Sequence, residues 1–216
     1  MCGIIGIYTE DYNEQVSRLL YQLAMESSIR GLHAFGWAYY SSNKIITNKQ
    51  FGLPELVDLR EIDKQHLKLI YHNRYSTSGD WKMMGNNQPI TINNDISVAM
   101  NGVITMAPPE EWAKKYELEF STENDTEIFA RFLEIGGDPE EFVAHMKGSF
   151  AAVFLWKGKL WALRNNRRPL HWFEHKNSVF VVSTQNIINR SVYGVKSYIV
   201  KPNKLVNVME LLHIGE

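Results

Sequence analysis

The sequence predicts an α+β fold, in which sheet-forming segments in both halves of the chain pack in layers with helices. Three observations lead to this prediction. Apolar runs with strand character alternate with helical patterns over the first two thirds, strands dominate from residue 149 onward, and no repeat or linker interrupts the 216 residues. This length suits one large domain or two small ones, and the absence of a linker favours a single domain over 1–216.

The N-terminal half is predicted to begin with a strand that leads into an amphipathic helix. Residues 3–8 are a β-rich apolar run, and residues 14–29 carry apolar side chains at helical spacing. Further buried runs predict a sheet built from additional strands. They cover 36–41, 44–50, 67–72 and 96–100, the first two joined by a turn at Ser42-Asn43.

The C-terminal half is predicted to contain helices first and strands afterwards. Helices are expected over 110–116 and 125–135, the second ended by Gly136-Gly137, and Asp138-Pro139 begins a third. The strands expected after them are 149–156 and 159–164, joined at Lys157-Gly158, then 171–175, 178–183, and a final pair near 196–201 and 204–210.

Charge, cysteine content and motif content argue against several classes of function. The chain has 23 Lys and Arg against 24 Asp and Glu, which gives no electrostatic basis for binding nucleic acid or an acidic membrane surface. One cysteine cannot form an internal disulfide, the N-terminus does not resemble a signal peptide, and the apolar runs are too short for a transmembrane helix, so we expect a cytosolic protein. No Cys pair and no Gly-rich phosphate loop occur, so we expect no metal, nucleotide or other cofactor.

The most informative residue is Cys2, the single cysteine, which directly follows Met1. If Met1 is removed, as the small side chain behind it should permit, residue 2 carries both a thiol nucleophile and a free α-amine. An α-amine has a pKa of about 7.7 to 8.0, so near pH 7 it can take the thiol proton and return it to a leaving amine. The alternative is a buried cysteine that only packs against an apolar strand.

Five segments together resemble the class II glutamine amidotransferase domain of the N-terminal-nucleophile hydrolases, and the resemblance spans nearly the whole chain. They are Cys2-Gly3-Ile4, Arg30-Gly31 with Gly36-Trp37-Ala38, the loop from Arg74 to Gly79, Asn101-Gly102, and Gly148-Ser149-Phe150 with Arg168-Pro169-Leu170. The resemblance implies a four-layer αββα sandwich of two mostly antiparallel sheets. It also implies that Cys2 is the nucleophile, that Arg30 supports the wall of the active site, and that the fifth segment is scaffold.

The other residues implied by this resemblance recognise glutamine and its reaction. Asn101 and Gly102 would form the oxyanion hole, although Asn-Gly is by itself a common turn signal. Arg74 can fork two hydrogen bonds onto the α-carboxylate, with Thr77 adding a hydroxyl and Ser78 at the rim of the loop. Asp125 can take the α-ammonium, although it also stands where a helix N-cap is expected.

Three departures from the family pattern concern the surroundings of this set. The family often has His before the Asn-Gly pair and after the Thr of the Arg loop, where this chain has Met100 and Ser78. The segment from Arg164 to Leu170 lacks the Gly that the family often has before Arg-Pro-Leu.

The expected partners are L-glutamine and, because the chain ends at Glu216 where the predicted sheet is complete, a separate synthase or ligase that receives ammonia. A free-standing glutaminase is the other possibility.

Three rival functions remain open from the sequence. The chain could be a Cys-His hydrolase, since seven His are present and His72 is close in sequence to Arg74. It could be a catalytically silent regulatory or interaction domain of the same fold, in which case Met1 would be retained. The third is another amide hydrolase with an N-terminal cysteine. That function would not explain why Arg74, Asp125 and Asn101-Gly102 occur together.

Overall fold

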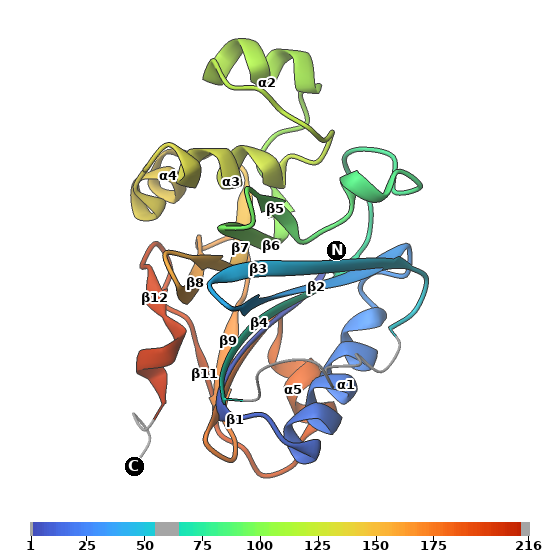
Figure 1. The fold of residues 1–216 in the computed structure, drawn as a ribbon, viewed down its shortest axis with the longest axis vertical. Helices are drawn as coiled ribbons and strands as arrows, with labels where there is room; N and C mark the ends of the chain where they lie inside the picture. Colours follow the sequence, from blue (N-terminus) through green and yellow to red (C-terminus); the bar gives the residue numbers. More distant parts are fainter. Residues whose placement is uncertain (1, 55–64, 213–216) are drawn as a thin grey trace.

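The computed structural model describes residues 2–54 and 65–212, which form two antiparallel sheets lying face to face with helices on both outer sides (Figure 1). The predicted α+β sandwich is therefore confirmed. The first sheet has, in spatial order, β11 (Ser197–Ile199), β9 (His171–Glu174), β10 (Ser178–Val182), β1 (Gly3–Asp11), β4 (Gln65–Arg74), β2 (Ala34–Ser41) and β3 (Lys44–Phe51). The second has β12 (Val206–Asn207), β8 (Lys159–Arg164), β7 (Ser149–Trp156), β6 (Ile96–Val103) and β5 (Ile90–Ile92).

The helices cover the outer faces of the two sheets. Helices α1 (Glu14–Ser28) and α5 (Gln185–Ser191) lie over the first sheet, and α3 (Thr126–Glu134) and α4 (Pro139–His145) lie over the second. Figure 1 shows α2 (Pro109–Tyr116) beyond α3, away from both sheets. Two short 3-10 helices, Met84–Asn86 and Val208–Leu211, complete the secondary structure of the described ranges.

Three apolar clusters hold the four layers together. The cluster between the sheets includes Ile4, Ile70 and Val153, each fully buried. A second joins the first sheet to α1 and α5, and a third joins the second sheet to α3 and α4. Burial of apolar area on this scale is the dominant favourable term in folding.

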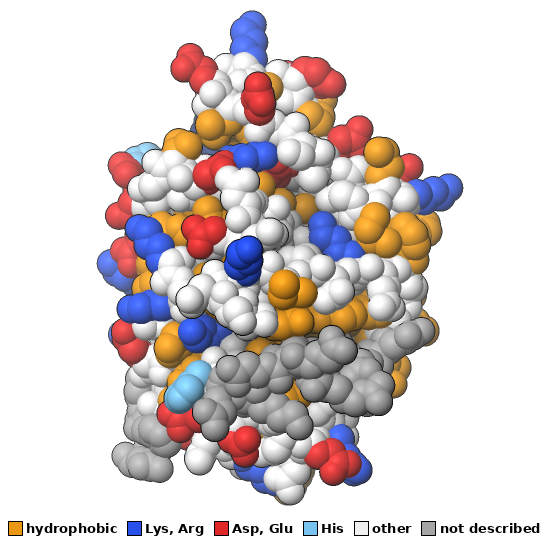
Figure 2. Space-filling model, viewed as in Figure 1, with side chains coloured by type: hydrophobic (Ala, Val, Ile, Leu, Met, Phe, Trp, Pro, Cys, Tyr) orange, Lys and Arg blue, Asp and Glu red, His pale blue; other side chains and the backbone are white. Residues whose placement is uncertain are grey.

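Local sequence explains why several elements begin and end where they do. Asn13 caps α1 by accepting hydrogen bonds from the backbone N–H groups of Gln15 and Val16 at 3.1 and 3.2 Å. Both residues of the Ser42-Asn43 turn have positive φ, which is the conformation of a two-residue hairpin turn. Acidic and basic side chains are intermixed over the face in Figure 2, in keeping with the net charge of −1.

The structure differs from the predicted elements in four places. Strand β6 continues through Asn101-Gly102 to Val103, so these residues are not a turn. The two last strands do not pair with each other, because β11 pairs with β9 and β12 with β8 in the other sheet. Most of the predicted strand 204–210 is replaced by a two-residue β12 and a 3-10 helix. Strand β5 and helix α5 were not predicted.

Candidate active site

Cys2 lies immediately before β1, which is an interior strand of the larger sheet with β4 on one side and β10 on the other. Its side chain is buried, and its Sγ is 3.4 Å from the carbonyl oxygen of Tyr75 and 3.5 Å from the Tyr75 nitrogen. The sulfur thus sits against the backbone of the loop that follows β4. Met1 lies outside the described residues, so its removal stays a prediction.

Arg30 holds the backbone of Cys2 from the other side. Its Nε donates a hydrogen bond of 2.9 Å to the Cys2 carbonyl oxygen. The next residue, Gly31, lets the chain pass close to the end of β4, because a Cβ there would lie 2.3 Å from the backbone carbon of Arg74. The predicted wall residue therefore contacts the predicted nucleophile directly.

The surroundings of the Cys2 thiol do not favour its ionised form. Burial raises the pKa of the Cys2 thiol above its ordinary value, and the opposing influence of the Tyr75 backbone and the positive charge of Arg74 is smaller. A thiol with a raised pKa is protonated at neutral pH. It therefore needs a base within reach before it can act as a nucleophile.

The side-chain amide of Asn101 contacts the backbone of Cys2 through one of its two ends. Its Oδ1 accepts a hydrogen bond of 3.2 Å from the Cys2 nitrogen, while its buried Nδ2 has no partner among the described residues. Gly102 is opposite Phe150, whose backbone N–H and C=O both bond to Asn165 instead. Because residues of an antiparallel pair alternate between bonded and non-bonded, the Gly102 N–H points away from β7, to the free side of β6.

Arg74 ends β4 with its side chain buried against the loop that it precedes. Its Nη2 donates to the Ser76 hydroxyl at 3.1 Å, to the Gly79 carbonyl oxygen at 3.2 Å, and to the Ser78 carbonyl oxygen. Its Nη1 is buried and has no partner among the described residues. One arm of the guanidinium thus holds the loop, and the other remains available to an anion.

Asp125 stands at the N-cap position of α3 but does not cap the helix with its side chain. Its Oδ2 instead accepts from the backbone N–H groups of Ile104 at 2.6 Å and Thr105 at 3.3 Å, and its Oδ1 accepts from the Ser78 hydroxyl at 3.3 Å. Burial raises the pKa of the Asp125 carboxyl above its ordinary value despite these hydrogen bonds and the positive charge of Arg74. The N-cap interpretation is therefore wrong for this side chain.

Thr77 occupies a different place from the other predicted substrate residues. It is exposed and lines a pocket of about 220 Å³ together with Ser78, Gly79, Thr105 and Trp112. The pocket lies beside the contact between Ser78 and Asp125. Thr77 is therefore next to the site rather than inside the cluster of hydrogen bonds around Cys2.

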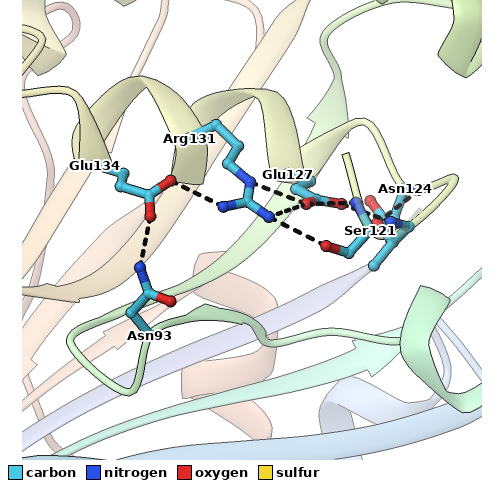
Figure 3. Close-up of polar contacts among 7 residues, drawn as sticks. Asn93, Ser121, Asn124, Glu127, Arg131 and Glu134 are labelled. Atoms are coloured by element: carbon cyan, nitrogen blue, oxygen red, sulfur yellow. Dashed lines mark hydrogen bonds and ion pairs between the residues drawn. The ribbon is translucent and has the colours of Figure 1, made fainter. Parts of the chain in front are cut away.

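A buried network behind Asp125 fixes the loop that carries it (Figure 3). The fully buried Glu127 accepts from the backbone N–H groups of Ser121 at 2.8 Å and Thr122 at 2.7 Å, and it pairs with Arg131 at 3.1 Å. Arg131 also pairs with Glu134 at 2.9 Å. The carboxylate of Glu127 thereby holds the turn just ahead of Asp125.

A second set of contacts ties this turn to the loop after Arg74. The Asn86 Oδ1 accepts from the Glu123 N–H at 2.8 Å, and the Asn124 side chain donates to the Asn86 carbonyl oxygen at 2.8 Å. Together with Glu127, Asn86 was not singled out from the sequence. Both are polar residues that matter because they are buried. Loops have no hydrophobic periodicity, so the sequence alone does not reveal that burial.

His72 is fully buried between the sheets and forms no hydrogen bond with the Cys2 sulfur. Its Nε2 donates to the Met100 carbonyl oxygen at 3.2 Å, and the Met100 N–H donates to Gln88 Oε1 at 2.6 Å. Burial, together with Arg74, lowers the pKa of His72 to about 3. Of the histidines in the described ranges, none forms a hydrogen bond with Cys2 Sγ, which disfavours a Cys-His dyad.

Within residues 2–54 and 65–212, no group of three or more His, Cys, Asp or Glu side chains is arranged to hold a metal ion. The helices of these same ranges all fall short of the length and apolar character needed to cross a bilayer.

Comparison with known proteins identifies relatives of this site. Residues 72–190 match the family described as "Glutamine amidotransferase domain". The amidophosphoribosyltransferase of Methanothermobacter thermautotrophicus is 26% identical over 204 residues, which cover 86% of this chain and 42% of that protein. The glutamine–fructose-6-phosphate aminotransferase of Brucella abortus is 30% identical over 171 residues, which cover 73% of this chain and 27% of that protein. The chain thus spans less than half the length of these curated relatives.

Solved structures show the same architecture. The glutamine phosphoribosylpyrophosphate amidotransferase of B. subtilis, solved with ADP and GMP, superposes on 93% of this chain and 46% of its own with a TM-score of 0.73 at 20% identity. A predicted glutamine amidotransferase from Pseudomonas aeruginosa covers 95% of both chains with a TM-score of 0.50 at 12% identity. The first of these likenesses confirms the predicted four-layer fold of two antiparallel sheets between helices.

Proposed function

Because the chain belongs to the class II glutamine amidotransferase family, we propose that it hydrolyses L-glutamine to glutamate and ammonia through a γ-glutamyl thioester on Cys2. The single observation that best supports this mechanism is the contact of 3.2 Å between the Cys2 nitrogen and Asn101 Oδ1. This contact brings the side-chain amide of Asn101, whose Nδ2 has no partner among the described residues, to residue 2. Residue 2 carries both the thiol and the nitrogen that would become the α-amine.

Binding uses the two buried charges at the far side of the cluster. The free Nη1 of Arg74 takes the α-carboxylate of glutamine, and the carboxylate of Asp125 takes the α-ammonium. Ser78 orients Asp125 through its hydroxyl, and Thr77 lines the adjoining pocket. A plain amide without these two charges would leave both buried groups unpaired, so the pair selects an amino acid.

The chemistry then proceeds in two displacements at the side-chain amide. The α-amine of Cys2, freed by loss of Met1, takes the thiol proton, and the sulfur attacks the amide carbon. Asn101 Nδ2 and the Gly102 N–H hold the developing oxyanion, and the protonated α-amine gives its proton to the leaving ammonia. A water molecule, deprotonated by the same amine, then hydrolyses the thioester and releases glutamate. Arg30 keeps the Cys2 backbone in place through both steps.

The test is covalent labelling with a diazoketone analogue of glutamine, followed by peptide mapping. We expect one label on Cys2, an N-terminal peptide that lacks Met1, and protection by L-glutamine but not by D-glutamine. Cys2→Ser provides the control that should take up no label. Label on another residue, or retained Met1 together with full glutaminase turnover, would contradict the proposal.

The fate of the ammonia is the second part of the proposal. The curated relatives carry more than half of their length outside the region that they share with this chain. We propose that residues 1–216 act as one glutaminase domain, and that the ammonia passes from this domain to a synthase or ligase outside these residues. Ammonia release should be slow with glutamine alone and should rise when the partner is added, whereas rapid turnover without a partner would contradict tight coupling.

Two of the three rival functions make different predictions in the same assays. A silent domain of this fold should retain Met1 and take up no label. A Cys-His hydrolase should lose all turnover on replacement of His72, whereas the proposed mechanism predicts that His72→Gln keeps it, because His72 forms no hydrogen bond with Cys2 Sγ.

A further inference from the structure

We propose that His33 is a positioning residue, which holds the backbone of Tyr75 and Ser76 against the sulfur of Cys2. This inference rests on the proposed function for its kinetic consequences but not for its effect on thiol reactivity. His33 lies between Arg30-Gly31 and β2, in a stretch where neither the predicted roles nor the mechanism above uses its side chain.

The imidazole of His33 is fixed by one hydrogen bond and by stacking on two rings. Its Nδ1 accepts from the backbone N–H of Ser76 at 3.0 Å. The ring stacks on Tyr75, with ring centroids 5.2 Å apart, and also on Trp81, with centroids 5.1 Å apart. Phe51 meets the ring of Trp81 edge-on at 5.9 Å and closes the stack. The ring thus has a single orientation.

The backbone of His33 is anchored to the same elements as its ring. Its N–H donates to the Arg74 carbonyl oxygen at 3.1 Å, and its carbonyl oxygen accepts from the Gly52 N–H at 3.2 Å. The residue is therefore attached at the end of β4 and just beyond the end of β3. Because its backbone is anchored at both places, the side chain of His33 can hold the loop that it contacts in a fixed position.

The segment held by His33 touches both parts of the site. Tyr75 supplies the carbonyl oxygen and the nitrogen that lie 3.4 and 3.5 Å from Cys2 Sγ. Ser76 supplies the hydroxyl that accepts from Arg74 Nη2 at 3.1 Å. A small displacement of this segment would therefore move a donor away from the sulfur and disturb the guanidinium that is to bind the substrate. Misplacement of about 1 Å at an active site can cost about a hundredfold in rate.

The hydrogen-bond chemistry identifies which feature of His33 is required. The Ser76 N–H is a donor, so Nδ1 must present its lone pair and the ring hydrogen must be on Nε2. Asn can offer an oxygen near the position of Nδ1 but cannot stack on two rings. Phe can stack but has no acceptor. These two substitutions therefore separate the hydrogen bond from the packing.

The experiment measures the rate of alkylation of Cys2 by iodoacetamide, without glutamine, together with kcat, KM and Tm. We expect His33→Phe to slow alkylation and to lower kcat by about tenfold or more with a smaller change in KM, while His33→Asn stays within about threefold of the parent. His145→Phe, on the exposed face of α4, controls for adding an apolar ring elsewhere.

The outcomes distinguish this inference from the proposed function. If His33→Phe slows alkylation in a protein that does not hydrolyse glutamine, the positioning role stands and the proposed function fails. If the parent hydrolyses glutamine and His33→Phe alters only Tm, or alters neither alkylation nor kcat, the positioning role fails. Should His33→Phe not fold, slower alkylation by His33→Ala relative to His33→Asn would support the role, and equal rates for the two would overturn it.

Discussion

Two nitrogen atoms, Asn101 Nδ2 and Arg74 Nη1, are buried donors that have no hydrogen-bond partner within the described residues. A buried donor left unpaired costs about 1–3 kcal/mol, so such groups are uncommon unless a ligand completes them. The first belongs to the amide whose oxygen contacts the Cys2 nitrogen, and the second belongs to the guanidinium that holds the loop after β4. Their separate roles lead to separate predictions.

The unpaired amide of Asn101 is tested by Asn101→Asp. The new side chain keeps an oxygen that can accept from the Cys2 nitrogen, but it loses the donor and adds a negative charge where the oxyanion develops. We expect kcat to fall by about 10²- to 10³-fold, as for loss of an oxyanion-hole donor, with a smaller change in KM. Steady-state ammonia release measures both constants. A variant with parental kcat would remove Asn101 from the proposed mechanism.

The carboxylate of Asp125 predicts opposite effects on binding and on stability. Asp125→Asn can keep the hydrogen bonds to Ile104, Thr105 and Ser78, but it cannot pair with an ammonium. We expect KM to rise at least about 30-fold, the equivalent of about 2 kcal/mol for a buried charge pair. The pKa of Asp125 is raised in the folded protein, so its ionisation as pH rises costs folding free energy. The free energy of unfolding of Asp125→Asn at pH 7 should therefore equal or exceed that of the parent.

Urea unfolding at pH 7 and at pH 4 separates these effects. Because ionisation of a carboxyl with a raised pKa costs folding free energy, the stability difference between Asp125→Asn and the parent should be larger at pH 7 than at pH 4. Ser78→Ala is the companion variant, since it removes one hydrogen bond to the same carboxylate and leaves the charge. A parental KM for Asp125→Asn would contradict the assigned role.

At the scale of the elements, the sequence predicted the long strands and most helices because their signals are local. Strands β7 and β8 are continuous apolar runs around a Lys-Gly turn, and α1 has a clear apolar stripe with an Asn cap. Helix α5 has only seven residues, and its buried Ile187 and Ile188 pack with α1, so it depends on tertiary contact. Strand β5 is too short for periodicity to be read.

The site shows the same division between local and non-local information. Asn101-Gly102 has the composition of a turn, yet it lies within β6. Gly102 is required there because a Cβ would lie 2.0 Å from the Ser149 carbonyl oxygen. Cys2 was found from its position directly after Met1, whereas Arg30, Arg74 and Asp125 were found through a resemblance to a family. The residues that fix them in place, such as Glu127 and His33, have no motif and become evident only from contacts.

The network on α3 predicts that a residue remote from the substrate affects its binding. Glu127→Gln replaces one carboxylate oxygen by an NH₂ group, which cannot accept from a backbone N–H, so a buried donor in the turn ahead of Asp125 loses its partner. We expect a loss of about 1–3 kcal/mol in the free energy of unfolding and a rise in KM, with Cys2 alkylation little changed. Glu134→Gln in the same network is the control (Figure 3), because exposed ion pairs contribute at most about 1 kcal/mol. Equal effects of the two variants would contradict the special role of Glu127.

At the scale of the whole molecule, the interface between the sheets contains a histidine that must stay neutral. The pKa of His72 is lowered to about 3 in the folded protein, against about 6.5 in an unfolded chain. Its neutral form therefore contributes stability above about pH 6.5 that is lost progressively as pH falls toward 3. One such group adds up to about 1.4 kcal/mol per pH unit to the slope of stability against pH.

His72→Gln tests this contribution to acid stability. The Gln side chain can still donate to the Met100 carbonyl oxygen but does not titrate, so the decrease in the free energy of unfolding between pH 6.5 and 4 should be less steep. Chemical unfolding at several pH values measures the slope, and His145→Gln on the exposed surface controls for loss of a histidine. An unchanged slope in His72→Gln would show that acid sensitivity arises elsewhere.

The order of strands in the larger sheet has a consequence for biosynthesis. Strand β1, near the start of the chain, needs β10 at Ser178–Val182 as one of its two neighbours. The ribosome must therefore release the nascent chain as far as β10 before β1 can pair with a strand on both of its edges. Until then it offers an open template for association with other chains. Translation halted ahead of β10 should thus yield aggregates in which the site around Cys2 has not formed. Chaperones that shield extended apolar segments should increase the yield of intact protein.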